Sequence, residues 1–396
     1  MNDMNSKILA MSIGNILEWY DFAVFGALAD VLGENFFPAQ SSTSALMSSF
    51  SVFGSAFLMR PVGGIVIGYI GDKFGRKRAL EISIMMMLFP SFFIGCLMPY
   101  KSWGVVSTVL LVILRLLQGL AVGGELAGAF IFTIESTGGK NRGFWGAVCK
   151  SSGICGTAIG MGIVAILRIA LSNDQLVAYG WRIPFLLTFF LVIVGIRVRR
   201  GLVENTEYQS ARIAQAETIS VSPIMYVMTK YWAEILLIVS SASFWCAGYY
   251  TCFVWLVYYM TSLLGDNDVR QAWVINFWNT LILICLLPVA GHFGDYVCSK
   301  CLNPEDGFRY VMLLGLLLML CGGCPAFLMV NHHVWWSACL GQLLFAAALA
   351  LFGANLPAFM VGLVGLSALL VLIRHDNRAK RSSWCLGYFT IHDYGL

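Results

Sequence analysis

Long apolar runs, separated by short clusters of charged residues, dominate the chain. Each run is long enough to cross a membrane, because about 20 apolar residues span a hydrocarbon core of ~30 Å as a helix. The runs cover residues 8–30, 45–70, 80–99, 104–134, 143–171, 182–198, 231–263, 270–291, 309–330 and 334–355. A further apolar stretch extends from Pro357 to Ile373. This pattern predicts an all-helical integral membrane protein.

The widest polar gap, Arg199–Lys230, divides the runs into two groups. We expect six helices before this gap and about four after it, given the length that one span needs. The predicted parts are an N-terminal bundle (residues 1–200), a cytoplasmic linker (201–230), an incomplete C-terminal bundle (231–373) and a polar tail (374–396).

Lys and Arg residues set the expected orientation. With the N-terminus inside, the inward segments contain the basic clusters at residues 73–78, 140–142 and 197–212, whereas the outward loops offer only Lys101 and Arg270. Cytoplasmic loops of membrane proteins carry such an excess of Lys and Arg. The distribution predicts a cytoplasmic N-terminus.

A short motif occurs twice and predicts the architecture. The sequence G68-Y-I-G-D72 precedes KFGRK, and G291-H-F-G-D295 precedes YVCSK, at an offset of 223 residues. Two copies on the same side of the membrane indicate parallel repeats about an axis along the membrane normal. At this offset a full copy of the first half would extend beyond residue 396. The repeat therefore predicts a twelve-helix fold that lacks its last two helices, with a tenth helix that is long or broken near Pro357.

Composition supports a membrane protein and excludes several other classes. The chain has 396 residues, of which 59% are hydrophobic and 12% charged, with a net charge of +4. Soluble domains have about 25% charged residues, so we exclude a soluble enzyme and a nucleic-acid binder. The twelve cysteines are scattered, whereas a metal site or disulfide framework needs them grouped. We expect no metal, no cofactor and no catalytic cluster.

Ionisable residues at membrane depth are costly and therefore indicate function. The first run contains Asn15, Glu18 and Asp21, spaced three apart and so within reach of one helix face. A carboxylate there can carry a proton, or it can form an ion pair between helices. Arg60, just before Pro61 in the second run, is either a structural partner of these carboxylates or part of the coupling site.

Two further cations and one acid lie in the fourth and fifth runs. Arg115 falls near mid-membrane in RLLQGLAVGGE, and Glu125 ends that motif. An uncompensated arginine at this depth is unfavourable, so Arg115 is expected to meet a carboxylate, a carbonyl or an anionic substrate. Lys150 is about two turns from the inner face; it either contacts substrate or extends its ammonium group to the interface.

Two other groups of residues are candidates for function. The loop after the second run contains Gly71, Asp72, Gly75, Arg76 and Lys77. We call these five residues the gating loop, because their charges can hold one conformation of a transporter or simply anchor its topology. Trp245, Tyr249, Tyr250 and Phe253 lie within two to three helical turns. They either form an aromatic cage for a quaternary ammonium group or pack as membrane aromatics do.

Several motifs together resemble the metabolite:proton symporter family of the major facilitator superfamily. They are GNILEWYDF, RPVGG followed by GDKFGRKRAL, RLLQGLAVGGE, ES followed by RG, and GWRIPF. Their order and spacing match over residues 12–185, and the resemblance continues to about Phe359. Within this family the chain is most similar to proline/glycine betaine transporters.

The resemblance implies proton-coupled uptake of a small organic solute by alternating access in a bacterial inner membrane. The implied partners are the solute, the proton and the bilayer, with the proton gradient as the energy source and a monomer as a sufficient unit. It also implies that Asp72, Gly75 and Arg76 gate the transporter and that Arg115 takes part in proton coupling.

Two alternatives remain open at this point. The first is a di- or tricarboxylate symporter of the same family, with Arg60, Arg115 or Lys150 as the anion site. The second is an inactive remnant, because the sequence after NLPAF departs from the family pattern. The resemblance implies that this departure, with the polar tail, results from a reading-frame shift or an early stop. The second motif copy also has Cys298 and Ser299 in the places of Gly75 and Arg76, so we expect it to form a weaker latch.

Overall fold

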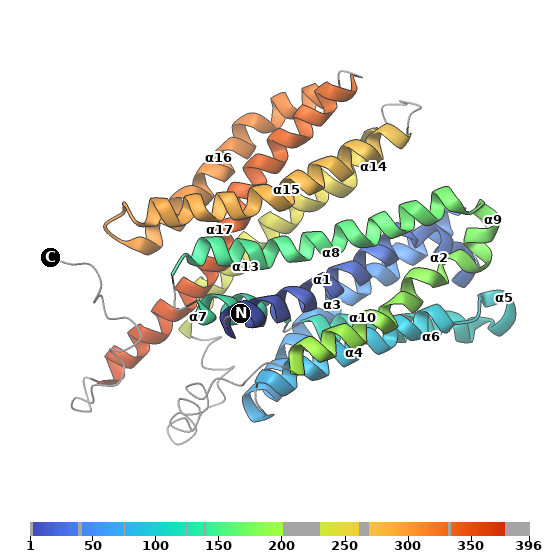
Figure 1. Cartoon of the computed structure of the whole chain (residues 1–396), viewed down its shortest axis with the longest axis horizontal. Helices are drawn as coiled ribbons and strands as arrows, with labels where there is room; N and C mark the ends of the chain where they lie inside the picture. The colour runs from blue at the N-terminus through green and yellow to red at the C-terminus, as the bar shows by residue number, and fades with distance from the viewer. Residues whose placement is uncertain are drawn as a thin grey trace.

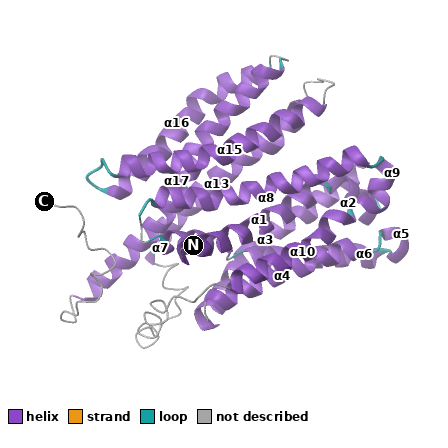
Figure 2. Ribbon diagram, viewed as in Figure 1, coloured by secondary structure: helices purple, strands orange, loops and turns teal. Residues whose placement is uncertain are grey.

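The computed structural model describes residues 3–38, 42–74, 76–123, 125–137, 140–200, 230–260, 269–331 and 334–376. Within these residues the regular structure is entirely helical, as the apolar runs predict (Figure 2). Residues 377–396, which include most of the predicted polar tail, lie outside the described residues. So does the predicted linker, apart from Lys230.

The elements before the linker form the first bundle (Figure 1). They are α1 (Asp3–Ala27), α2 (Ala29–Phe36), α3 (Ser42–Phe74), α4 (Arg76–Cys96), α5 (Tyr100–Trp103), α6 (Val105–Val122), α7 (Glu125–Ser136), α8 (Arg142–Ala170), α9 (Asn173–Gln175), the π-helix η1 (Leu176–Gly180) and α10 (Arg182–Arg200). The second bundle contains α13 (Trp232–Tyr250), the π-helix η2 (Thr251–Trp255), α14 (Leu256–Tyr258), α15 (Val269–Cys298), α16 (Pro304–Val330) and α17 (Trp335–Asp376).

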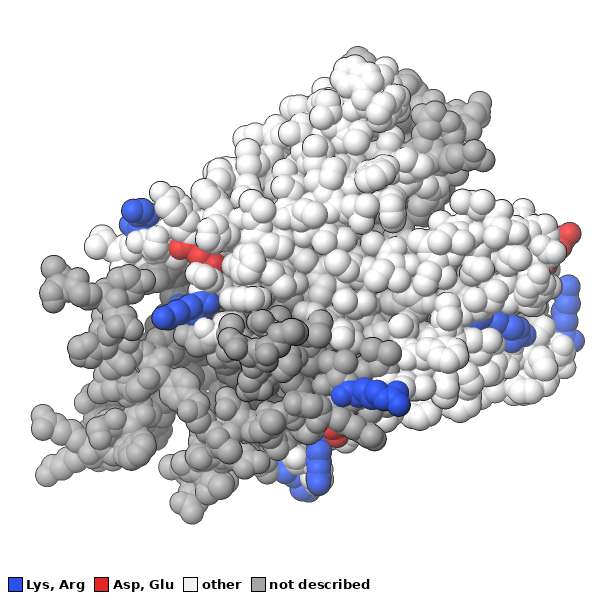
Figure 3. Space-filling view, viewed as in Figure 1, with Lys and Arg blue, Asp and Glu red and all other residues white. Residues whose placement is uncertain are grey.

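The helices have the length and the surface of membrane spans. Seven described helices are long and apolar enough to cross a membrane, and two shorter apolar helices cover Glu81–Cys96 and Arg182–Leu191. Large apolar side chains point outward, among them Leu320 at 75% exposure and Val289 at 66%. A broad uncharged band runs over α16, α15 and α8 (Figure 3). Such a surface is stable against lipid rather than water, so the chain is a multi-pass membrane protein.

Within the described residues three predicted runs are divided, among them the run 231–263, which contains α13, η2 and α14. The run 104–134 is divided into α6 and α7, and the run 8–30 is divided at Leu28 into α1 and α2. By contrast, α17 continues through Pro357 without a break, so the long form of the tenth helix is the one observed. Proline is tolerated inside membrane helices when neighbouring helices pack around it, and here α8 and α16 both contact α17.

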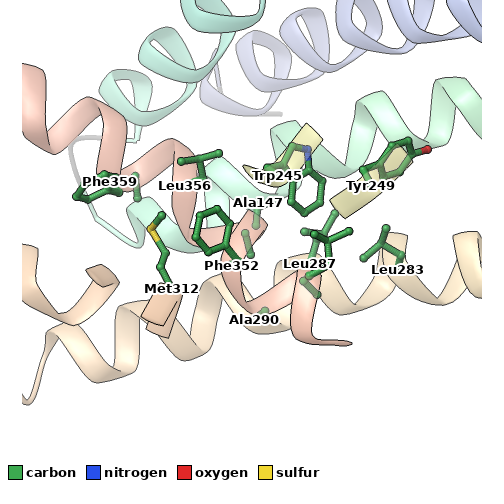
Figure 4. Close-up of a cluster of buried hydrophobic side chains, with 14 of the residues drawn as sticks. Ala147, Trp245, Tyr249, Leu283, Leu287, Ala290, Met312, Phe352, Leu356 and Phe359 are labelled. Atoms are coloured by element: carbon green, nitrogen blue, oxygen red, sulfur yellow. The ribbon is translucent and has the colours of Figure 1, made fainter. Parts of the chain in front are cut away.

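The two bundles are joined along α8. This helix contacts α1 in its own bundle and α15 and α17 in the other. Its Ala147 belongs to the apolar core of the second bundle, beside Leu287 and Ala290 (Figure 4). At the start of α8 a Cβ atom on Gly143 would lie 2.5 Å from the carbonyl oxygen of Gly291, so only glycine allows this approach. We call this end of the molecule, defined by Gly143 and Gly291, the joined end.

Candidate functional site

A fully buried ion pair forms the centre of the first bundle. Arg115 on α6 donates from Nη1 to Oδ2 of Asp21 on α1 at 3.0 Å, and both side chains are completely buried. Neither charge could remain at this depth alone, because desolvation of a lone ion costs far more than a helix can supply. Of the partners expected for Arg115, the structure therefore shows a carboxylate.

Two neutral side chains extend this pair into a network. Gln118, one turn after Arg115, accepts from the Nη1 of that arginine at 2.8 Å. Its Nε2 donates to Oδ2 of Asp21 at 2.8 Å and to the Ser91 hydroxyl at 2.7 Å. The Asp21 carboxylate is thus held by donors from α6, and through Gln118 it is linked to α4.

Phenylalanine rings enclose the Arg115 guanidinium. Its central carbon lies 4.1 Å from the centroid of the Phe25 ring, 4.5 Å from that of Phe22 and 5.3 Å from that of Phe53. Aromatic faces attract a cation and at the same time exclude water. The pair therefore lies in an apolar enclosure in which its mutual attraction is strong.

A second acid and base meet one turn away along α1. Nη2 of Arg60 on α3 lies 3.6 Å from Oε1 of Glu18, whose side chain is fully buried, whereas Arg60 is 21% exposed. The guanidinium carbon also lies 4.5 Å from the Phe57 ring and 4.6 Å from the Phe22 ring. Phe22 therefore contacts both arginines, so the two ion pairs are neighbours in one site.

Asn15 links α1 to α8 by hydrogen bonds. Its Nδ2 donates to the carbonyl oxygen of Cys149 at 2.6 Å and to the Ser152 hydroxyl at 3.1 Å. All three predicted α1 residues thus face inward, but Asn15 points to α8 while the two carboxylates meet arginines.

Lys150 links the two bundles. It lies on α8, is 8% exposed, and places its Nζ 3.7 Å from the centroid of the Trp245 ring on α13. The ammonium group is therefore directed at an aromatic face of the second bundle rather than at the membrane interface. The next residue, Ser151, donates to the carbonyl oxygen of Ile284 on α15 at 3.2 Å.

The predicted aromatic residues form a ladder rather than four faces around one point. Trp245 stacks on Tyr249 at 6.2 Å between ring centroids, and Tyr249 stacks on Phe253 at 5.2 Å. Tyr250 contacts Tyr249 edge to face at 6.0 Å and Phe57 of α3 edge to face at 6.4 Å between ring centroids. The ladder belongs to the core of the second bundle, while Tyr250 faces the Arg60 side of the first.

The remaining predicted residues are only partly described. Gly75 lies outside the described residues, and α3 ends at Phe74 while α4 begins at Arg76. The side chains of Asp72, Arg76, Lys77 and Glu125 are also outside the description, and so is the environment of Gly71. Among the described residues no group of His, Cys, Asp and Glu side chains could hold a metal ion.

The second motif copy has a contact that the sequence did not predict. Asp295 on α15 accepts from the backbone N–H groups of Gly143 and Phe144, each at 2.8 Å. These are the first N–H groups of α8, which no helical carbonyl satisfies. A carboxylate there also interacts favourably with the positive end of the helix dipole. Asp295 therefore caps α8 across the joined end.

Sequence reasoning also missed residues around the two ion pairs. Gln118 had a signal, since it lies one turn from Arg115 on the same helix face. Ser91 and Phe53 had no such signal in the sequence. Ser91 on α4 and Phe53 on α3 reach the site only because their helices pack against the others.

Comparisons with known proteins agree with this architecture. The family model described as "Sugar (and other) transporter" matches residues 7–363. The proline/betaine transporter of Escherichia coli K12 is 30% identical over 380 residues, covering 92% of this chain and 73% of that protein. A glycine betaine/proline/ectoine/pipecolic acid transporter of Dickeya dadantii is 28% identical, with the same coverage.

Solved structures show the same fold. The proton:xylose symporter XylE, of the major facilitator superfamily, superposes with a TM-score of 0.62 at 15% identity, covering 98% of this chain and 90% of that one. A partially occluded inward-open form of XylE from E. coli superposes with a TM-score of 0.61 at 19% identity. The chain therefore belongs to the sugar (and other) transporter family, and it is similar there to proline/betaine transporters.

Proposed function

We propose that the protein is a secondary transporter that takes up a proline- or betaine-type solute together with protons. The observation that carries this proposal is the buried pair of Asp21 and Arg115, joined at 3.0 Å within a phenylalanine enclosure. A carboxylate that is balanced by one guanidinium can exchange a proton when that guanidinium shifts. Asp21 would then carry the proton, and Arg115 would set when it binds and leaves.

The charges of the site favour a substrate with a single carboxylate. Arg115 is paired with Asp21 and Arg60 with Glu18. Of the cations predicted as an anion site, this leaves Lys150 without an ion pair to any described carboxylate. A di- or tricarboxylate would need further free cations, so we favour the osmolyte over the alternative of a citrate-like anion. The names of the relatives support the same choice.

The contacts between the bundles support alternating access. At the joined end Asp295 and the Gly143–Gly291 approach hold α15 against α8. Opening this end would break both contacts and would also withdraw Ala147 of α8 from the apolar core of the second bundle. Transport would then proceed by opening this end while the opposite ends approach each other, with the joined end on the cytoplasmic side.

The test is uptake of labelled glycine betaine by cells that express the full chain. We expect accumulation above the external concentration, loss of accumulation when a protonophore is added, and competition by unlabelled proline but not by citrate. Accumulation that a protonophore leaves unchanged would contradict proton coupling. Competition by citrate but not by proline would favour the carboxylate alternative, and no uptake of any solute would favour the inactive remnant.

A further inference from the structure

Lys150 is a buried cation whose charge no described carboxylate balances. The residue is 8% exposed and makes no ion pair with any described residue. The Trp245 ring, 3.7 Å from Nζ, is its observed partner. The attraction of an aromatic face offsets only part of the hydration free energy that an ammonium group loses when it leaves water. The free energy of this group would therefore fall if an anion came beside it.

The neighbouring cations do not share this property. Arg115 lies 3.0 Å from Asp21, and Arg60 lies 3.6 Å from Glu18. An entering carboxylate would have to compete with an existing carboxylate at either arginine. At Lys150 it would compete only with the face of an indole ring.

Trp245 is held in a fixed position for this contact. Its ring stacks on Tyr249, and a side chain on Gly353 of α17 would collide with the indole. The indole is thus supported by α13 and α17, and the Lys150 ammonium lies over its face from α8. Trp is the aromatic residue that binds a quaternary ammonium group most strongly.

We propose that Lys150 and Trp245 form a two-part site for a zwitterion. The positive group of the substrate takes the indole face, and the displaced Lys150 ammonium binds the carboxylate of the substrate. Without substrate, Lys150 itself occupies the indole face, as the structure shows. This inference rests on the proposed function for its substrate class, and it assigns the two charged ends of that substrate to opposite bundles.

The exchange explains how the site would select its ligand. A cation without a carboxylate would displace Lys150 from the indole and leave the ammonium group with no partner. An anion without a positive group would leave the indole face empty when it draws Lys150 away. Only a molecule that carries both charges satisfies both residues at once, and by doing so it connects α8 to α13.

The test is equilibrium binding to the purified full chain in lipid nanodiscs, measured by calorimetry. The probes are glycine betaine, choline as a cation without carboxylate, and acetate as an anion without cation. For Lys150→Gln we expect betaine affinity to fall by at least about tenfold, while choline binds at least as tightly as to the wild type. For Trp245→Leu we expect both affinities to fall. Lys101→Gln, an exposed lysine of α5, is the matched control.

Lys150→Arg keeps the cation and should retain most of the betaine affinity, which separates a charge effect from a folding defect. Betaine affinity of Lys150→Gln equal to that of the wild type would overturn the proposal, as would parallel loss of betaine and choline binding. Absence of betaine binding to the wild type would also overturn it. Wild-type binding without proton-driven accumulation would instead contradict the proposed function and leave this site standing.

Discussion

Two carboxylates of α1 each meet an arginine from a different helix. The spacing of Glu18 and Asp21 predicted that both would share a helix face, and both are fully buried there. The sequence also indicated that Arg60 and Arg115 need partners. It could not assign the pairs, because Asp21 and Arg115 are 94 residues apart and meet only when α1 and α6 pack.

At the residue scale, we predict that Arg115→Ala lowers stability sharply and abolishes solute accumulation without preventing membrane insertion. Removing one member of a buried ion pair leaves the other charge unbalanced and costs about 3–5 kcal/mol. The double variant Asp21→Asn with Arg115→Gln removes both charges and should recover most of that loss. Thermal unfolding of the purified variants measures both effects.

The control for this cycle is Arg168→Ala. Arg168 pairs with Asp30 at 2.7 Å, but both side chains are exposed, at 38% and 53%. Exposed pairs contribute about 0–1 kcal/mol, so this variant should unfold close to the wild type. Equal losses for Arg115→Ala and Arg168→Ala would show that burial of the Asp21–Arg115 pair does not stabilise the fold.

At the scale of elements, the apolar runs predicted the existence of the long helices but not their irregularities. The π-helix η2 interrupts the helix that begins with α13. Two of its carbonyl groups accept hydrogen bonds from side chains: Gln342 of α17 donates to the Cys252 carbonyl at 2.8 Å, and Asn276 of α15 donates to the Phe253 carbonyl at 3.1 Å. Hydropathy carries no signal for such a network, since the donors lie on two other helices.

We therefore predict that Gln342→Leu destabilises the second bundle. Leucine leaves the Cys252 carbonyl without that donor and also removes the partner of Asn276, to which Gln342 donates at 2.7 Å. A buried polar group without a partner costs about 1–3 kcal/mol, which thermal unfolding can detect. Asn331→Ala, which removes an exposed contact with Tyr259, serves as the control and should change little. Equal melting temperatures for Gln342→Leu and wild type would contradict this role.

At the scale of the whole molecule, the repeat predicted two parallel bundles, and the fold agrees with that architecture. The repeat did not predict that the Asp295 carboxylate would bind the start of α8 at the joined end. Cys298 and Ser299 suggested a weak latch, yet the aspartate three residues earlier accepts two N–H groups from the start of α8. This contact depends on how the bundles pack on each other, which no local pattern encodes.

Asp295→Ala should loosen the joined end. Loss of a helix-capping side chain costs about 1 kcal/mol, so the amides of Gly143 and Phe144 should exchange with deuterium severalfold faster. Hydrogen–deuterium exchange with mass spectrometry measures this. Asp306→Ala, which removes a surface pair with Arg309, should leave these amides unchanged. Unaltered exchange in Asp295→Ala would show that this carboxylate does not hold the joined end.

The most direct test of proton coupling compares wild type and Asp21→Asn in proteoliposomes loaded with glycine betaine. Two fluxes are measured for each protein: exchange of labelled betaine without a gradient, and accumulation driven by an imposed proton gradient. Asparagine keeps the size of Asp21 and an acceptor oxygen but cannot carry the proton. Because it leaves the Arg115 charge unbalanced and so lowers stability, both fluxes are measured below the unfolding temperature of the variant. We predict that Asp21→Asn retains exchange and loses gradient-driven accumulation. Wild-type accumulation by Asp21→Asn would contradict the assignment of Asp21 as the proton carrier.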